Sequence, residues 1–194
     1  MRTLILIATL LLTAPAALGA MIGIYLDPED GPYGMGTAPC AWLDTDQPLT
    51  LYIVAFLDEL SESGITAAEF RVSNWLGGLE PDLHVSMEYS TDLVIGDPGW
   101  DLAMAWNEPV GVGAERVLLA TATIYLFDPE ALSDDHWMTI TEGYDCDCLV
   151  LVNDLFEAID VYGDRILIYC NADCGWCDTT PTGASSWSTL KSLY

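Results

Sequence analysis

The fold is decided by Leu49-Thr50-Leu51-Tyr52-Ile53-Val54-Ala55-Phe56-Leu57, a run that is apolar on both faces. Such a run is typical of a central strand that lies between two packed layers. Outward from it, residues 65–73 and 83–89 alternate apolar and polar side chains with the period of two of a half-buried strand. The longest β-rich run follows at residues 115–127.

Turn signals separate these runs, among them Gly77-Gly78, Asp97-Pro98-Gly99 and Glu108-Pro109. About seven short strands at this spacing predict an all-β fold, an antiparallel β-sandwich of immunoglobulin-like or cohesin-like type. We expect residues 31–48 to form a loop, and residues 153–159 to form a strand-poor loop or a single turn.

The segment from Pro48 to Phe127 resembles the core of cohesin-type and related immunoglobulin-like sandwiches. The match rests on residues 49–54, on Gly64-Ile65-Thr66-Ala67-Ala68-Glu69-Phe70-Arg71-Val72 and on residues 117–124. These are packing motifs, so the resemblance implies a fold. The chain has Asn74-Trp75-Leu76-Gly77-Gly78 where the cohesin pattern places Asp-Pro, and dockerin binding is therefore not carried over.

The first twenty residues predict a secretory signal peptide. One charge at Arg2 precedes the apolar run of residues 4–12, and small residues follow up to Ala20. A membrane-spanning helix needs about 20 apolar residues, whereas this run breaks at Pro15. We expect a signal peptide at 1–20, a β-sandwich domain at 21–178, and a linker with a C-terminal tail at 179–194. The mature chain is then secreted, periplasmic or at the cell surface, with no membrane span. The ending from Trp187 to Tyr194 resembles a Trp-x-x-Val/Ile-Lys-x-Leu-Tyr terminus of exported bacterial proteins.

The charge of the chain excludes one class of partner. Without Arg2, four basic residues stand against 30 acidic ones, a formal charge of −26. Nucleic-acid binding needs clustered lysine and arginine to neutralise phosphates, so nucleic acid is excluded. A solvated acidic surface is the simplest interpretation of this charge.

The cysteine count predicts disulfides in an exported chain. The sequence does not fix their pairing. Cys174-Gly175-Trp176-Cys177 also has the spacing of a thiol redox site, but nothing in the sequence supplies the βαβ context that such a site needs. We therefore expect a disulfide staple near the C-terminus, built from Cys40, Cys146, Cys148, Cys170, Cys174 and Cys177.

Two further groups of residues are candidate binding sites. Asp27, Glu29 and Asp30 cluster oxygen ligands in a loop, as calcium requires, although without the EF-hand pattern. Trp75, Trp100 and Trp176 lie beside glycines in expected loops, where exposed indoles bind glycans or protein partners. The alternative is that these rings cover the core.

We interpret the chain as an exported, non-catalytic binding or structural module with a protein or glycan ligand. It needs no cofactor beyond calcium in this interpretation. The alternative is a secreted enzyme, either a carboxylate-based hydrolase or a thiol-disulfide oxidoreductase that uses residues 174–177.

Overall fold

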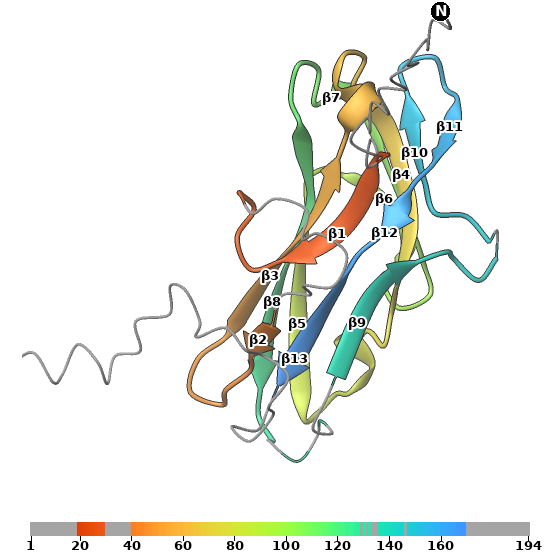
Figure 1. Ribbon diagram of the computed structural model, residues 1–194. Helices are drawn as coiled ribbons and strands as arrows, with labels where there is room; N and C mark the ends of the chain where they lie inside the picture. The colour runs from red at the N-terminus through yellow and green to blue at the C-terminus, as the bar shows by residue number, and fades with distance from the viewer. Residues whose placement is uncertain are drawn as a thin grey trace, which may run out of the picture.

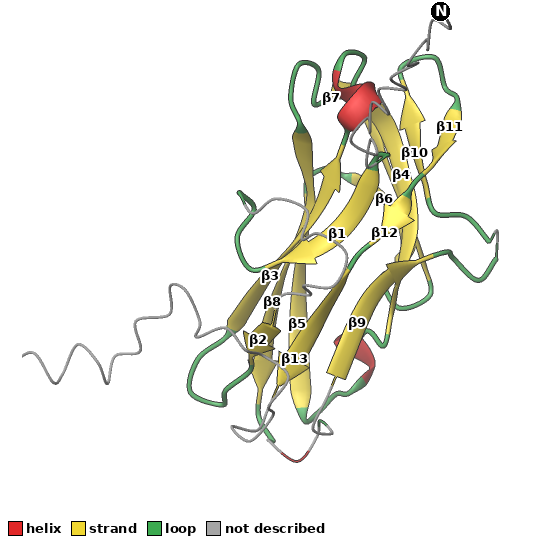
Figure 2. Ribbon diagram, viewed as in Figure 1, coloured by secondary structure: helices red, strands yellow, loops and turns green. Residues whose placement is uncertain are grey.

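Two β-sheets pack face to face in the computed structural model, which describes residues 19–29, 40–128, 130, 132, 136–145 and 147–169. The 3-10 turns η1 (Asp58–Ser61) and η2 (Leu76–Gly78) lie between strands (Figures 1 and 2). The strands are β1 (Met21–Tyr25), β2 (Cys40–Trp42), β3 (Leu49–Phe56), β4 (Ile65–Ser73), β5 (Leu83–Tyr89), β6 (Leu93–Asp97), β7 (Asp101–Val110), β8 (Arg116–Leu126), β9 (His136–Thr141), β10 (Val150–Asn153), β11 (Ala158–Asp160), β12 (Tyr162–Gly163) and β13 (Arg165–Tyr169).

The first sheet has the strand order β12-β1-β3-β8-β5. The apolar run at 49–57 supplies its strand β3, which pairs with β1 on one side and β8 on the other. The second sheet contains β11-β10-β4-β9-β13-β2, with β7 paired to β4 and β6 paired to β7. The prediction of a β-sandwich is confirmed. The sheets are mixed rather than purely antiparallel, because β1 pairs with β12 and β13 pairs with β2 in parallel.

The core lies between the inner rows of the two sheets. Strand β4 shows how the sequence produces it: Ala68, Phe70 and Val72 are buried, whereas the residues between them are half-buried on the outer face. This is the alternation that the sequence predicts. The largest fully buried side chains are Tyr25, Phe70, Ile22, Ile24, Leu43, Leu51, Ile53, Leu57, Ile65, Leu76, Leu83 and Leu102.

Strand β4 pairs with β7 along one edge, and with β10 and then β9 along the other edge. Its residues 65–70 pair with β7, and residues 65–69 also pair with β10, so β7 and β10 lie on opposite sides of β4. The carbonyl of Pro98 accepts a hydrogen bond from the Val72 amide at 2.6 Å, so the β6–β7 turn occupies the same edge of β4 as β7 does. Strand β9, which pairs with residues 71–73, therefore lies on the β10 side.

Strands β9 and β10 therefore follow each other along the same edge of β4, and residues 142–149 form a loop that leaves this edge between them. We call this loop the excursion. Thr141 lies opposite Arg71, and Val150 lies opposite Glu69. A regular strand would place one residue between them, whereas this chain has the whole segment 142–149. Figure 1 shows the excursion as the long loop that joins β9 to β10.

One local prediction from the sequence is wrong, and a second is right only for the middle of its segment. The expected loop at 31–48 contains strand β2, which pairs with β13. The segment 153–159, expected to be a strand-poor loop or a single turn, has its turn at residues 154–157, but its ends belong to β10 and β11, which form a hairpin with Leu151 opposite Ile159. Short strands of three or four residues give too little alternation to be detected in the sequence.

The described side chains include only part of the predicted disulfide staple. Cys148 is disulfide-bonded, but its partner is not among them. The side chain of Cys40 and all of Cys146, Cys170, Cys174 and Cys177 lie outside the described residues, so the pairing stays a prediction. Within the described part of the chain, no helix is long and apolar enough to cross a membrane.

Candidate functional site

The outer face of the second sheet carries an apolar hollow of about 150 Å³, lined mainly by residues of β4, β6 and β7 with Val152 of β10. We call it the alanine groove and define it by the side chains of Ala67, Glu69, Leu93, Ile95, Ala103, Ala105 and Val152.

The strand registers explain why the groove forms. One row across the sheet runs Leu93, Ala105, Ala67, Val152, and the next row runs Ile95, Ala103, Glu69, Val150. Neighbouring strands lie about 4.8 Å apart, and side chains of the same row stand side by side. Because the two central strands contribute alanine at three of four positions, the floor is low while larger side chains stand on both sides.

The β6 wall of the groove is strongly exposed. Leu93 and Ile95 have exposed fractions of 56% and 67%. Strand β6 pairs with β7 alone among the described strands, so it forms an edge of the sheet. Fully burying a leucine or isoleucine side chain contributes about 1.5–3 kcal/mol. A partner that covers Leu93 and Ile95 would therefore gain, for each residue, a substantial part of this burial free energy.

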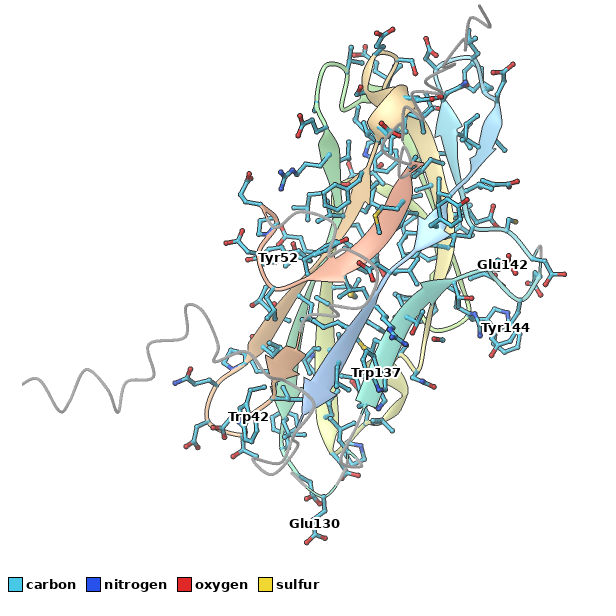
Figure 3. The ribbon with its side chains drawn as sticks, viewed as in Figure 1. Trp42, Tyr52, Glu130, Trp137, Glu142 and Tyr144 are labelled. Atoms are coloured by element: carbon cyan, nitrogen blue, oxygen red, sulfur yellow. The ribbon has the colours of Figure 1, made fainter. Side chains whose placement is uncertain are left out.

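An aromatic cluster stands on the same face, further along β4. The Arg71 guanidinium lies 3.7 Å from the centre of the Tyr144 ring, whose centre is 4.6 Å from that of the Trp100 ring. Arg71 Nε also donates a hydrogen bond to the Glu142 carbonyl at 3.0 Å. Figure 3 shows Glu142 and Tyr144 on the loop after β9. The cluster therefore holds the 142–149 excursion against the sheet beside the groove.

The tight turn between β6 and β7 places Trp100. Gly96 has a φ of +93°, and a Cβ at this position would lie 1.8 Å from the Asp101 carbonyl oxygen. Only glycine fits such a close approach. Asp101 Oδ2 accepts a hydrogen bond from the Asp145 amide at 3.2 Å, and Asp101 Oδ1 is buried with no partner among the described residues. The turn and the excursion are thus joined at the end of the groove.

At the opposite end of β4, the β10–β11 hairpin presents two exposed apolar side chains. Leu155 is 70% exposed and Phe156 is 81% exposed, with a positive φ of 63° at Phe156. The buried Asn153 holds this tip, because its Oδ1 accepts hydrogen bonds from the amides of Leu155 and Glu157, each at 2.9 Å. The hydroxyl of Thr66 donates to the Asn153 carbonyl at 2.9 Å. The tip is therefore tied directly to β4.

The positively charged side chains of the described surface contact aromatic rings. Arg71, Arg116 and Arg165 each lie over an aromatic ring, with the last two at 5.6 Å from Phe56 and 4.4 Å from Trp137. Carboxylates lie in and beside the groove instead: Glu69 is part of its lining, and Asp97 lies opposite Asp101 two positions beyond Ile95 and Ala103 on β6 and β7. A molecule that docks on this face must accommodate this negative potential.

Tyr89, at the end of β5 before the β6 hairpin, has a raised pKa. Burial of its phenol is the larger cause, and the negative charge of Asp97 adds to it. Both effects favour the neutral phenol. The residue therefore packs against the core as an uncharged aromatic side chain.

The tryptophans predicted as ligand-binding residues have different surroundings. Trp75 is half-buried and packs against the core, close to Gly99. Trp100 is 57% exposed and lies in the aromatic cluster. The turn 97–100 thus brings these two residues to the same end of the sandwich. Trp176 lies outside the described residues.

The residues predicted for calcium lie in the loop after β1. Asp27 and Glu29 are exposed, and the Asp27 carboxylate accepts a hydrogen bond from the Glu29 amide at 2.9 Å. Asp30 lies outside the described residues. In the part of the chain that the structure describes, no group of three or more His, Cys, Asp or Glu side chains is arranged to hold a metal ion. Calcium binding by these residues stays a prediction.

The groove itself was not predicted from the sequence. Leu93-Val94-Ile95 is an uncharged apolar run between turn residues, and Ala103 and Ala105 occupy alternate positions of the next strand. Together these features indicate a hairpin with one smooth apolar face. The third alanine, Ala67, joins them through long-range pairing, which no local pattern reveals.

Comparison with known proteins finds likeness in structure alone. No family model matches the chain, and no curated protein matches it. The sixth cohesin of scaffoldin B from Acetivibrio cellulolyticus, solved in complex with a Cel5 dockerin, is similar at 9% identity and a TM-score of 0.48; the match covers 78% of this chain and 98% of the cohesin.

Two further solved structures are similar at lower scores. A cohesin module from a Clostridium perfringens family 33 glycoside hydrolase has 8% identity and a TM-score of 0.44, over 78% of this chain and 96% of that one. A collagen-binding domain from a Staphylococcus aureus adhesin has 6% identity and a TM-score of 0.30, over 62% and 87%. These likenesses concern the sandwich fold, and no partner or activity is carried over from them here.

Proposed function

We propose that the chain is a non-catalytic protein-binding module whose docking surface is the alanine groove. The observation that supports this proposal is the groove itself, an apolar floor on the outer face of a sheet with the exposed Leu93 and Ile95 along one side. The fold gains nothing from leaving Leu93 and Ile95 uncovered in water. A surface of this kind is typical of a site where a partner segment is buried.

The partner is a protein segment with apolar side chains flanked by lysine or arginine. The groove supplies apolar contact, and the surrounding carboxylates attract positive charge. Glu69 lies in the groove itself and would set the position of one basic side chain. Glycan binding through the tryptophans has weaker support, because the exposed Trp100 ring contacts Tyr144 within a cluster that holds the excursion.

We place this module outside the cytoplasm as part of the same proposal, on the signal-peptide pattern of residues 1–20. Ala20 is buried against the core, and its carbonyl accepts a hydrogen bond from the Tyr162 amide at 3.2 Å. Cleavage after Gly19 keeps this contact, whereas cleavage after Ala20 removes it. Mass spectrometry of the exported chain distinguishes the two.

A synthetic amphipathic peptide tests the docking surface. The probe contains one tryptophan, several leucines and four lysines, and the control probe has glutamates in place of the lysines. Calorimetric titration at low salt should show saturable binding of the lysine probe alone. Ala105→Arg fills the groove and should weaken binding about tenfold, equivalent to about 1.4 kcal/mol.

Thr123→Arg is the matched control. It adds the same side chain to β8, on the outer face of the other sheet, and should change the affinity less than twofold. Equal losses in both variants would mean that the probe responds to net charge alone. An absence of saturable binding to the unmodified chain would contradict the proposal.

A further inference from the structure

We propose that the C-terminal segment Trp187–Tyr194 of the same chain docks in the alanine groove and competes there with an external partner. This inference rests on the proposed function, because it uses the same groove. It assigns to the tail the role of an internal ligand, and it makes the groove a regulated site.

Charge is the first argument. Residues 179–194 contain no aspartate or glutamate, and they hold Lys191, the only lysine of the chain. The three arginines of the described part already lie over aromatic rings. The tail is therefore the segment of this chain best matched to a groove that contains Glu69 and has carboxylates around it.

Size and chemistry give the second argument. A cavity of about 150 Å³ with apolar walls is large enough for one aromatic ring. The tail supplies such a ring at Trp187, and Leu190 and Leu193 follow at intervals of three residues. Trp187 in the hollow leaves Lys191 four residues further on, within reach of the Glu69 carboxylate.

The chain is long enough to make this contact. Arg165 lies opposite Thr139, which lies opposite Ser73, so β13 runs parallel to β4 two strands away. From Tyr169, the groove at Ala67 is then about 33 Å along the strands and about 10 Å across them. Residues 170–186 span at most about 56 Å when extended. The tail therefore reaches the groove of its own molecule, provided that the predicted disulfides of Cys170, Cys174 and Cys177 leave this segment extended.

Docking of the tail would lower the affinity for an external partner. A tethered segment has an effective concentration in the millimolar range. A tail that binds the groove with a dissociation constant of about 0.1 mM would then weaken an external ligand about tenfold. A partner gains access when it binds more tightly than the tail or when the tail is engaged elsewhere.

The test compares full-length mature chains. Trp187→Asp removes the proposed anchor, and Thr180→Asp adds the same charge to the linker as the matched control. In Trp187→Asp, the amide resonances of Ala67, Ala103 and Ala105 should shift, and the lysine probe should bind about tenfold more tightly. Thr180→Asp should change neither. Lys191→Glu should release the tail partly, with a larger effect at low salt.

The outcomes separate this inference from the proposed function. If the probe binds the unmodified chain and Trp187→Asp equally, while Ala105→Arg still weakens it, the tail inference is wrong and the docking surface stands. If the probe binds neither Trp187→Asp nor the unmodified chain, both proposals fail. Groove shifts that depend on protein concentration and accompany a dimer mass would overturn docking within one molecule.

Discussion

The outer faces of the two sheets differ although their inner faces are alike. Inward, both present aliphatic rows, such as Leu51 and Ile53 on β3 or Ala68 and Phe70 on β4. Outward, the second sheet carries the alanine groove. The first sheet instead carries hydroxyl and polar rows, with Thr50, Thr123 and Ser86 in one row and Tyr52, Thr121 and Glu88 in the next.

This difference shows which residues the fold requires. A sheet with one solvated face normally reads polar outward, as β3, β8 and β5 do. The outward row of the second sheet departs from that rule without any structural need, because its side chains face away from the core. The inner rows therefore account for stability, whereas the groove is the surface that we propose for binding.

The largest expected effect concerns the inner row. Phe70→Ala removes a fully buried ring between the sheets and should lower the free energy of unfolding by about 3–5 kcal/mol. Thr123→Ala on the outer face of β8 should change it by no more than about 0.5 kcal/mol. Urea denaturation with both variants measures the contrast, and equal losses would mean that the outer row also carries stability.

The turn that forms one end of the groove comes next. Gly96→Ala forces a Cβ against the Asp101 carbonyl at a positive φ and should cost roughly 1–3 kcal/mol. Gly78→Ala is the control, since a Cβ there meets no atom within 4 Å. Thermal unfolding should separate the two variants by several degrees. A Gly96 variant as stable as the Gly78 variant would contradict the close approach.

The aromatic cluster should give a smaller and local effect. Arg71→Ala removes the contact with Tyr144 and the hydrogen bond to Glu142, worth about 1–2 kcal/mol together. Hydrogen exchange of residues 142–145 should accelerate. Arg165→Ala loses the same charge and a similar contact with Trp137, and it should leave exchange in the excursion unchanged. Acceleration in both variants would point to net charge instead.

The smallest effect on stability is expected in the groove wall. The double change Leu93→Thr and Ile95→Thr places a β-branched residue at both positions of the edge strand and should alter stability by only about 0.5 kcal/mol per site. Binding of the dye ANS to the folded protein should fall. The converse change, Thr121→Val with Thr123→Val, should increase dye binding by making the opposite face apolar. If Leu93→Thr with Ile95→Thr lowered the free energy of unfolding by several kcal/mol, the groove wall would be needed for folding.

The sequence predicts the sandwich because its longest strands repeat the core pattern. The runs at 49–57, 65–73 and 115–127 all became strands of the two sheets. Strand β6 was missed, because its five residues lack the polar alternation that identifies a half-buried strand. That same departure from alternation is what makes one wall of the groove.

The candidate site was predictable only in part. Trp100 was selected from its place beside glycine, and it does lie exposed, in the aromatic cluster beside the alanine groove. Its neighbours Arg71 and Tyr144 are separated by more than seventy residues in the chain, and only the pairing of β4 with β9 brings them together. Long-range register of this kind has no local signal in a single sequence.

The excursion between β9 and β10 can change in length and sequence without changing the pairing of the strands. Pairing with β4 ends at Thr141 and resumes at Val150, so the number of residues between them does not affect the register of either strand. Insertions, deletions or grafted peptides at 142–149 would change the side chains next to the groove without shifting the paired strands of the sandwich. The pairing of β4 therefore does not fix the length of this loop, which lies beside the surface that we propose for docking.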